Sequence, residues 1–160
     1  MTDENRVTVQ RRISAPADEI FAIVCDPNMH VEIDGSGMLQ AAPDAKQLQQ
    51  VGDSFEMDMD REPLGDFPMG KYKVLNTVTR IEHGKTLEWN IGGFGMDPFG
   101  HVYGYELTVI DDGETEVILY CDWSGIPEEM RTAVTWPVVP VHMLEKSLDN
   151  LDRIMSDAGK

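Results

Sequence analysis

Residues 6–27 read R-V-T-V-Q-R-R-I-S-A-P-A-D-E-I-F-A-I-V-C-D-P, and the spacing of apolar residues changes halfway along this segment. Over 6–13 apolar and polar residues alternate, which predicts a half-buried strand, with Arg11 as the exception on its inner face. The next residues combine a proline suited to a first helical turn with apolar residues at helical spacing, so they predict a helix. Asp26 can cap a second short helix over 27–33 in a similar way.

Beyond these helices the chain returns to strand patterns separated by turns, as far as residue 127. Short turns between successive strands indicate antiparallel pairing, with one packed and one wet face. From Val141 to Met155 apolar residues recur at steps of three and four, which predicts an amphipathic final helix. Prolines at 137 and 140 should break it near its start. The expected strands cover 37–41, 47–51, 55–62, 69–82, 86–92, 102–110 and 114–123.

Composition and charge narrow the class of protein. The chain has 160 residues, 41% hydrophobic and 26% charged, as in a globular protein, and we expect one domain over 1–160. The net charge of −16 comes without a long basic cluster, so binding to nucleic acid or to anionic membranes is not expected. The start M-T-D-E-N-R lacks the features of a signal peptide, and no apolar run could span a bilayer. We therefore expect a cytoplasmic protein without integral membrane association, in which Cys25 and Cys121 are reduced and buried.

The order of these elements resembles that of the START/Bet v 1-like (SRPBCC) superfamily, and specifically its polyketide cyclase/dehydrase-like branch. The resemblance rests on residues 7–27, on L-Q-Q-V-G-D-S-F-E-M and on the amphipathic H-M-L-E-K-S-L-D-N-L near the C-terminus. It implies an α+β helix-grip fold, in which a curved antiparallel sheet wraps around a long C-terminal helix and encloses an apolar cavity. Members of the superfamily bind lipids, sterols, quinones or polyketides, and a minority catalyse cyclisation or dehydration.

Motifs that would indicate a cofactor or a metal are missing from the sequence. There is no H-E-x-x-H, C-x-x-C, G-x-x-x-x-G-K or G-x-S-x-G, and the glycines at 92–95 do not follow the dinucleotide fingerprint. The four histidines are scattered, so we expect neither a metal site nor a cofactor. His30 is expected to be exposed and His83 to lie in a turn. His142 stands beside the apolar seam of the final helix, and His101 could point inward as a hydrogen-bonding group or general base.

Methionine and aromatic residues dominate the inward face of the predicted sheet. Flexible thioethers and amphipathic rings suit a cavity that accepts an irregular apolar ligand, although the same residues could simply fill a core. The candidate ligand-binding residues are Phe55, Met57, Met59, Tyr72, Trp89, Tyr103, Tyr105, Cys121, Trp123, Trp136 and Met143. The candidates for catalysis are His101, Tyr103, Tyr105 and Asn76.

The stretch F-E-M-D-M-D-R-E at 55–62 could be interpreted in two ways. Its carboxylates at Glu56, Asp58 and Asp60 could form a cation site, or they could be the wet face of a strand whose other face is Phe55, Met57 and Met59. A strand sends alternate side chains to opposite faces, so only one set can face the interior. A straight ladder of carboxylates gives no convergent cage of oxygens, which favours the second interpretation.

Three functional hypotheses follow. The leading one is binding of a hydrophobic small molecule, such as an isoprenoid, a fatty acyl compound or a polyketide. The second is an enzyme of the cyclase or dehydratase type, which would bring two polar groups together inside the cavity. The third is a protein-interaction module of the chaperone-activator kind, which would expose an apolar patch instead. The oligomeric state stays open, with a homodimer as one option.

Overall fold

The computed structural model describes residues 5–64, 70–93, 97–133 and 136–158. Among them, seven strands form one antiparallel sheet in the order β1-β7-β6-β5-β4-β3-β2. The predicted α+β order is confirmed: one strand, two short helices, successive strands and a long final helix. The elements are β1 (Arg6–Ile13), α1 (Ala17–Val24), α2 (Pro27–Ile33), β2 (Leu39–Ala41), β3 (Ser54–Asp60), η1 (Glu62–Leu64), β4 (Lys71–Glu82), β5 (Thr86–Gly93), β6 (Pro98–Asp111), β7 (Glu114–Asp122), α3 (Glu128–Ala133) and α4 (Val141–Ala158).

The prediction of a strand at 47–51 is wrong. The backbone N–H groups of Gln49 and Gln50 donate to the Asp53 carboxylate, at 2.8 and 3.1 Å. The N–H of Leu48 donates to the carbonyl of Cys25 at 2.8 Å. These donors are therefore engaged by a local turn and by the end of α1, so this segment does not pair as a strand. Met69, expected to begin the next strand, lies outside the described residues.

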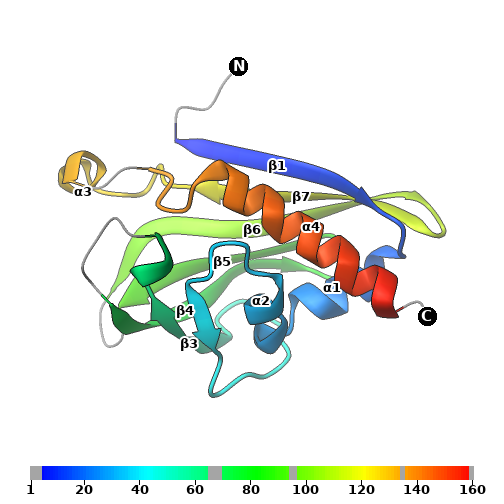
Figure 1. Ribbon diagram of the computed structural model, residues 1–160, viewed down its shortest axis with the longest axis horizontal. Coiled ribbons are helices and arrows are strands. Elements are labelled where there is room, and N and C mark those ends of the chain that lie inside the picture. The colour runs from blue at the N-terminus through cyan, green and yellow to red at the C-terminus, as the bar shows by residue number, and fades with distance from the viewer. Residues whose placement is uncertain (1–4, 65–69, 94–96, 134–135, 159–160) are drawn as a thin grey trace.

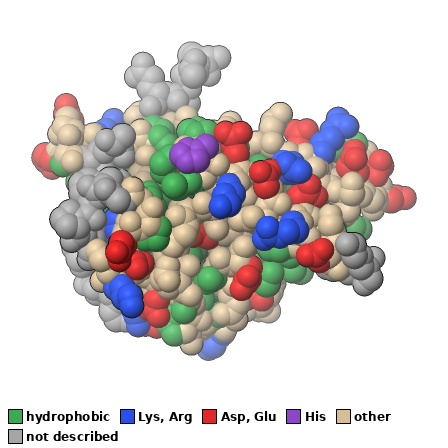
Figure 2. Space-filling model, in the orientation of Figure 1, with side chains coloured by type: hydrophobic (Ala, Val, Ile, Leu, Met, Phe, Trp, Pro, Cys, Tyr) green, Lys and Arg blue, Asp and Glu red, His purple; other side chains and the backbone are tan. Residues whose placement is uncertain are grey.

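Helix α4 crosses one face of the sheet, with α1 toward one end of the molecule and α3 at the other (Figure 1). Acidic and basic side chains are interspersed on the face of the molecule shown in Figure 2. Arg11, the charged exception on the inner face of β1, reaches this helix and donates from Nε to Asp152 at 2.9 Å. Its position therefore serves the contact between β1 and α4. None of the helices in the described part of the chain is long and apolar enough to cross a bilayer.

The solid part of the interior lies between α1, the final turns of α4 and the sheet. Pro16 precedes α1, and α1 presents its buried apolar side chains to this core. Helix α4 contributes residues at helical spacing, as its sequence predicts. The side chains at this centre are at most 2% exposed, and they include Ile13, Ile20, Val24, Leu87, Val117, Leu148 and Leu151.

On the opposite face of the sheet, Tyr120 is fully buried without being part of that core. Its hydroxyl donates to Glu88 at 2.7 Å, and the Arg6 guanidinium lies 3.9 Å from its ring centroid. The ring covers Gly104 on the neighbouring strand so closely that a Cβ there would lie 2.3 Å from the Tyr120 ring. Only glycine leaves room for this ring against β6.

We predict that Gly104→Ala destabilises the protein by about 2 kcal/mol or more, because an aromatic ring held by Glu88 and Arg6 cannot move aside cheaply. Urea denaturation measures the change. The matched control is Gly113→Ala, where a Cβ would meet nothing within 4 Å. In a Tyr120→Ala background the cost of Gly104→Ala should fall below about 0.5 kcal/mol. An equal cost in both backgrounds would contradict the role given to the ring.

Candidate functional site

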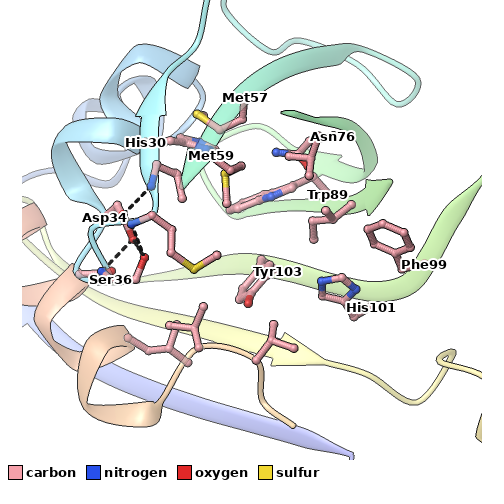
Figure 3. Close-up of a pocket in the computed structure, with 18 of the residues that line it drawn as sticks. His30, Asp34, Ser36, Met57, Met59, Asn76, Trp89, Phe99, His101 and Tyr103 are labelled. Carbon is pink, nitrogen blue, oxygen red and sulfur yellow. Dashed lines mark hydrogen bonds between the residues drawn. The ribbon is translucent and has the colours of Figure 1, made fainter. Parts of the chain in front are cut away.

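A cavity of about 690 Å³ lies beside the solid core (Figure 3). Its walls come from the face of the sheet that α4 crosses, from α2 and the loop after it, from the first turns of α4, and from the segment before α4. Most of the lining side chains are apolar or aromatic, including Ile33, Met38, Met57, Met59, Val74, Trp89, Ile91, Phe99, Leu119, Trp136, Val139 and Leu144. Strand β3 has the predicted register, because Phe55 and Met57 are buried while Glu56 and Asp58 pair with Lys73 on the other face.

The loop after α2 forms a polar corner of the cavity. Asp34 Oδ1 accepts hydrogen bonds from the N–H and hydroxyl of Ser36, at 2.9 and 2.7 Å, and Oδ2 accepts from the N–H of Leu39 at 3.1 Å. The carboxylate is thus held by the turn that leads into β2 (Figure 3). Because His30 and Asp34 are four residues apart, the end of α2 places both on the cavity side. That spacing indicates a shared face of the helix, and the packing of α2 determines that this face points toward the cavity.

Arg61 is a second lining residue that the sequence analysis missed. It is 5% exposed, and it donates from Nη2 to the carbonyl of Val138 at 3.0 Å, while Nη1 lies 3.5 Å from the sulfur of Met38. Its position continues the period-two alternation of Met57 and Met59 beyond the end of β3. That phase predicts an inward side chain. The arginine therefore joins the loop after β3 to the segment that precedes α4.

His30 was expected to be exposed, and the structure corrects this, since the side chain is buried at 6% exposure and lines the cavity. Its Nε2 lies 2.7 Å from the Val24 carbonyl at the end of α1. Its ring also packs against Phe55 and Trp89, with centroid distances of 5.3 and 4.9 Å. Burial lowers the pKa of His30 below 6.5, against opposing effects of the Val24 hydrogen bond and of Asp26. The ring is therefore neutral near pH 7.

Two more polar side chains are buried in the cavity wall, Asn76 on β4 and His101 on β6, each 6% exposed. Within the described ranges, Asn76 Oδ1 and His101 Nδ1 are enclosed without a hydrogen-bond partner. Burial lowers the pKa of His101 from 6.5 to about 4. Buried polar atoms in folded proteins are nearly always paired, so these two positions call for an explanation beyond packing.

The tyrosines of β6 also face the cavity. Burial, followed by the adjacent Cys121 thiol, raises the pKa of Tyr103 well above 10. Burial and then the Asp34 charge raise the pKa of Tyr105. Both hydroxyls stay protonated across the physiological range, so they act as neutral hydrogen-bonding groups.

The structure brings together most of the residues singled out from the sequence. Those that line the cavity are Met57, Met59, Tyr72, Asn76, Trp89, His101, Tyr103, Tyr105 and Trp136. Phe55, Cys121, Trp123 and Met143 do not belong to the lining. Phe55 and Cys121 are fully buried, Phe55 against the rings of His30 and Trp89 and Cys121 in a smaller cluster with Trp123 and Ile126. Within the described ranges, no three His, Cys, Asp or Glu side chains gather so that they could hold a metal ion.

A curved antiparallel sheet, a long C-terminal helix against it and two short helices after the first strand define the helix-grip fold. The fold is shared with the Zhui aromatase/cyclase from Streptomyces sp. R1128, with a TM-score of 0.65 and 10% identity over 97% of this chain and 95% of that one. It is also shared with protein NE0264 from Nitrosomonas europaea, with a TM-score of 0.66 and 13% identity over 99% of each chain.

Similarity in sequence is more restricted. No protein-family model matches the chain. An uncharacterized protein of Mycobacterium tuberculosis is 31% identical over 112 residues, which make up 70% of this chain and 45% of that relative. The match therefore extends over less than half the length of the relative.

We predict that the burial of His101 makes the folded protein less stable as the pH falls. The unfolded side chain takes up a proton near pH 6.5, whereas the folded one stays neutral down to about 4. Its contribution to stability is therefore complete above pH 6.5 and is lost as the pH falls toward 4. Between pH 7.5 and 5 the native protein should lose about 2 kcal/mol more stability than the His101→Phe variant, as measured by urea denaturation. Titration of the folded His101 ring near 6.5 in NMR spectra would contradict this prediction.

Proposed function

We propose that the protein binds one hydrophobic small molecule, of the isoprenoid, fatty acyl or polyketide kind, in the cavity beside α4. The observation that carries the proposal is the cavity itself, because 690 Å³ falls within the roughly 300–1,000 Å³ typical of ligand sites. Protein interiors otherwise pack densely and leave few voids larger than a water molecule. A space of this size, lined mainly by apolar side chains, suits an apolar molecule better than water.

The side chains of the wall support the same proposal. Met38, Met57 and Met59 supply flexible thioethers that can adapt to an irregular shape. A few buried polar groups, among them Asn76 and His101, interrupt the apolar surface and could orient a ligand. This combination of a mostly apolar wall with sparse polar groups is typical of small-molecule sites.

We predict saturable binding of planar apolar fluorophores such as 1-aminoanthracene, with one molecule bound per chain. Ile91→Trp places a larger side chain in the cavity wall and should weaken binding at least about tenfold, since the added volume competes with the probe. Val109→Trp is the matched control, because Val109 is 63% exposed on β6 and does not line the cavity. Probe fluorescence and calorimetry measure both variants.

Native mass spectrometry of protein purified from its own host adds a second measurement, in which a co-purifying small molecule is expected. Two results would overturn the proposed function. One is the absence of saturable binding across 1-aminoanthracene, Nile red, farnesol and palmitate. The other is equal loss of binding in Ile91→Trp and Val109→Trp, since the exposed position has no contact with the cavity.

An enzyme of the cyclase or dehydratase type is the second candidate function. It is supported by the likeness in fold to an aromatase/cyclase and by the contact of His101 with Tyr103, whose ring centroids are 5.9 Å apart. Efficient general acids and bases have pKa values near the working pH. Burial instead moves the pKa of His101 to about 4 and that of Tyr103 well above 10. These directions favour binding over acid–base catalysis by this pair.

The interaction-module hypothesis has less support. Among the described residues, the exposed large hydrophobic side chains are Val51, Val109, Ile110 and Val141, which belong to three different parts of the chain. An internal cavity is the more developed apolar feature.

A further inference from the structure

Aromatic rings form a continuous row along the cavity wall, with one histidine at each end. The ring of His30 lies 4.9 Å from that of Trp89, which lies 6.2 Å from Tyr103, which in turn lies 5.9 Å from His101. Figure 3 shows the two histidines well separated on opposite sides of Trp89 and Tyr103. The row joins residues of α2, β5 and β6 along the cavity wall.

The His30 end of the row offers a hydrogen-bond acceptor. A backbone carbonyl can only accept, so the 2.7 Å contact between Nε2 and the Val24 oxygen requires the proton on Nε2. In the neutral ring Nδ1 then carries a lone pair. Because Nε2 is taken and the ring lines the cavity, Nδ1 is the nitrogen left for a ligand. This nitrogen accepts a hydrogen bond from a hydroxyl or an N–H group.

The His101 end offers a donor instead. Its Nδ1 is enclosed and has no hydrogen-bond partner among the described residues. Buried N–H groups without an acceptor are rarer in proteins than buried lone pairs without a donor, which places the proton on Nε2. The ring also lines the cavity, so Nε2–H is the group available to a ligand. It donates to a carbonyl or an ether oxygen.

We propose that the two histidines determine which ligand the cavity selects and in which direction the ligand lies. The ligand class is an elongated, ring-bearing molecule with a hydroxyl group at the His30 end and a carbonyl or ether oxygen at the His101 end. The row of rings between them favours flat, conjugated ligands, because the ring of such a ligand can stack on this aromatic wall. This inference rests on the proposed function and makes the ligand class and orientation specific.

Four biphenyl probes test the proposal. One ring carries a hydroxyl or a methoxy group, and the other carries an acetyl or an ethyl group. The native protein should bind the hydroxyl probes about fivefold more tightly than the methoxy probes, and the acetyl probes about fivefold more tightly than the ethyl probes. The same four substitution patterns on naphthalene vary the distance between the two ends. Quenching of tryptophan fluorescence reports binding, because Trp89 and Trp136 line the cavity.

Variants assign each preference to one histidine. His101→Phe should lose the acetyl preference and keep the hydroxyl preference, and His30→Phe should do the opposite. His142→Phe, at an exposed position on α4 outside the cavity lining, is the matched control and should keep both.

A measurement on the native protein covers the case in which His30→Phe fails to fold without its Val24 hydrogen bond. The ¹⁵N resonance of His30 Nδ1 should shift when the hydroxyl probe binds and stay in place with the methoxy probe. If no probe binds saturably, the proposed function itself fails. If all four bind with equal affinity, or if the hydroxyl preference follows His101 rather than His30, the proposed function stands and this inference is overturned.

Discussion

The contact between the loop after α2 and helix α4 holds the two sides of the cavity together. A Cβ on Gly35 would lie 2.3 Å from the Met143 carbonyl oxygen and 2.8 Å from the Ser147 nitrogen, so the two backbones meet with no room for a side chain. The Gly35 N–H donates to the Ser147 hydroxyl at 2.9 Å, and Asn150 donates to the Ile33 carbonyl at 3.0 Å. This contact fixes the end of α2 against the helix, and with it the positions of His30 and Asp34.

The start of α4 explains why the interior is solid at one end and hollow at the other. A helix packed on a sheet fills the space between them along its own length. Helix α4 begins only at Val141. The segment Trp136–Val139 before it is not helical, and all of its residues except Pro137 line the cavity. Pro140 lacks a backbone donor, which suits the first turn of a helix and not its interior. Farther along α4 the side chains of Leu148 and Leu151 fill the core, whereas the first turns of α4 and the segment before it line the cavity.

The sequence predicted most of the fold and only part of the site, for a physical reason. The alternation of apolar and polar residues along a strand identifies which side chains point inward, because a packed sheet requires apolar residues on one face. It cannot separate a residue that lines a cavity from one that fills a core, since both are apolar and inward. Phe55 and Met57 share a face of β3, yet only Met57 reaches the cavity. That difference depends on where α4 begins and on how α2 docks, which are tertiary properties.

The polar residues of the site were harder to predict than the apolar ones. Arg61 continues the phase of β3, but a charged side chain just past a strand is ordinarily solvated. His30 belongs to a short helix that borders the cavity, and its burial follows from the packing of α1 against α2 through the Val24 carbonyl. The local sequence does not predict such a tertiary contact. The prediction of a strand at 47–51 was wrong for a related reason. The Asp53 carboxylate accepts hydrogen bonds from backbone N–H groups that strand pairing would need.

Several kinds of ligand fit the cavity by size, and the charges of the protein favour some of them over others. The chain carries a net charge of −16, so an anionic ligand meets repulsion as it approaches, although salt screens this beyond roughly 10 Å. Inside, the cationic Arg61 is accompanied by the anionic Asp34 on the same wall, and each already has hydrogen-bond partners in the protein. The two buried histidines are neutral near pH 7, because burial lowers the pKa of each. A neutral ligand with hydrogen-bonding groups at its ends avoids both the external repulsion and the cost of burying an unpaired charge. If the cavity binds a ligand as proposed, the charge distribution therefore favours a neutral molecule over an anionic one such as a free fatty acid.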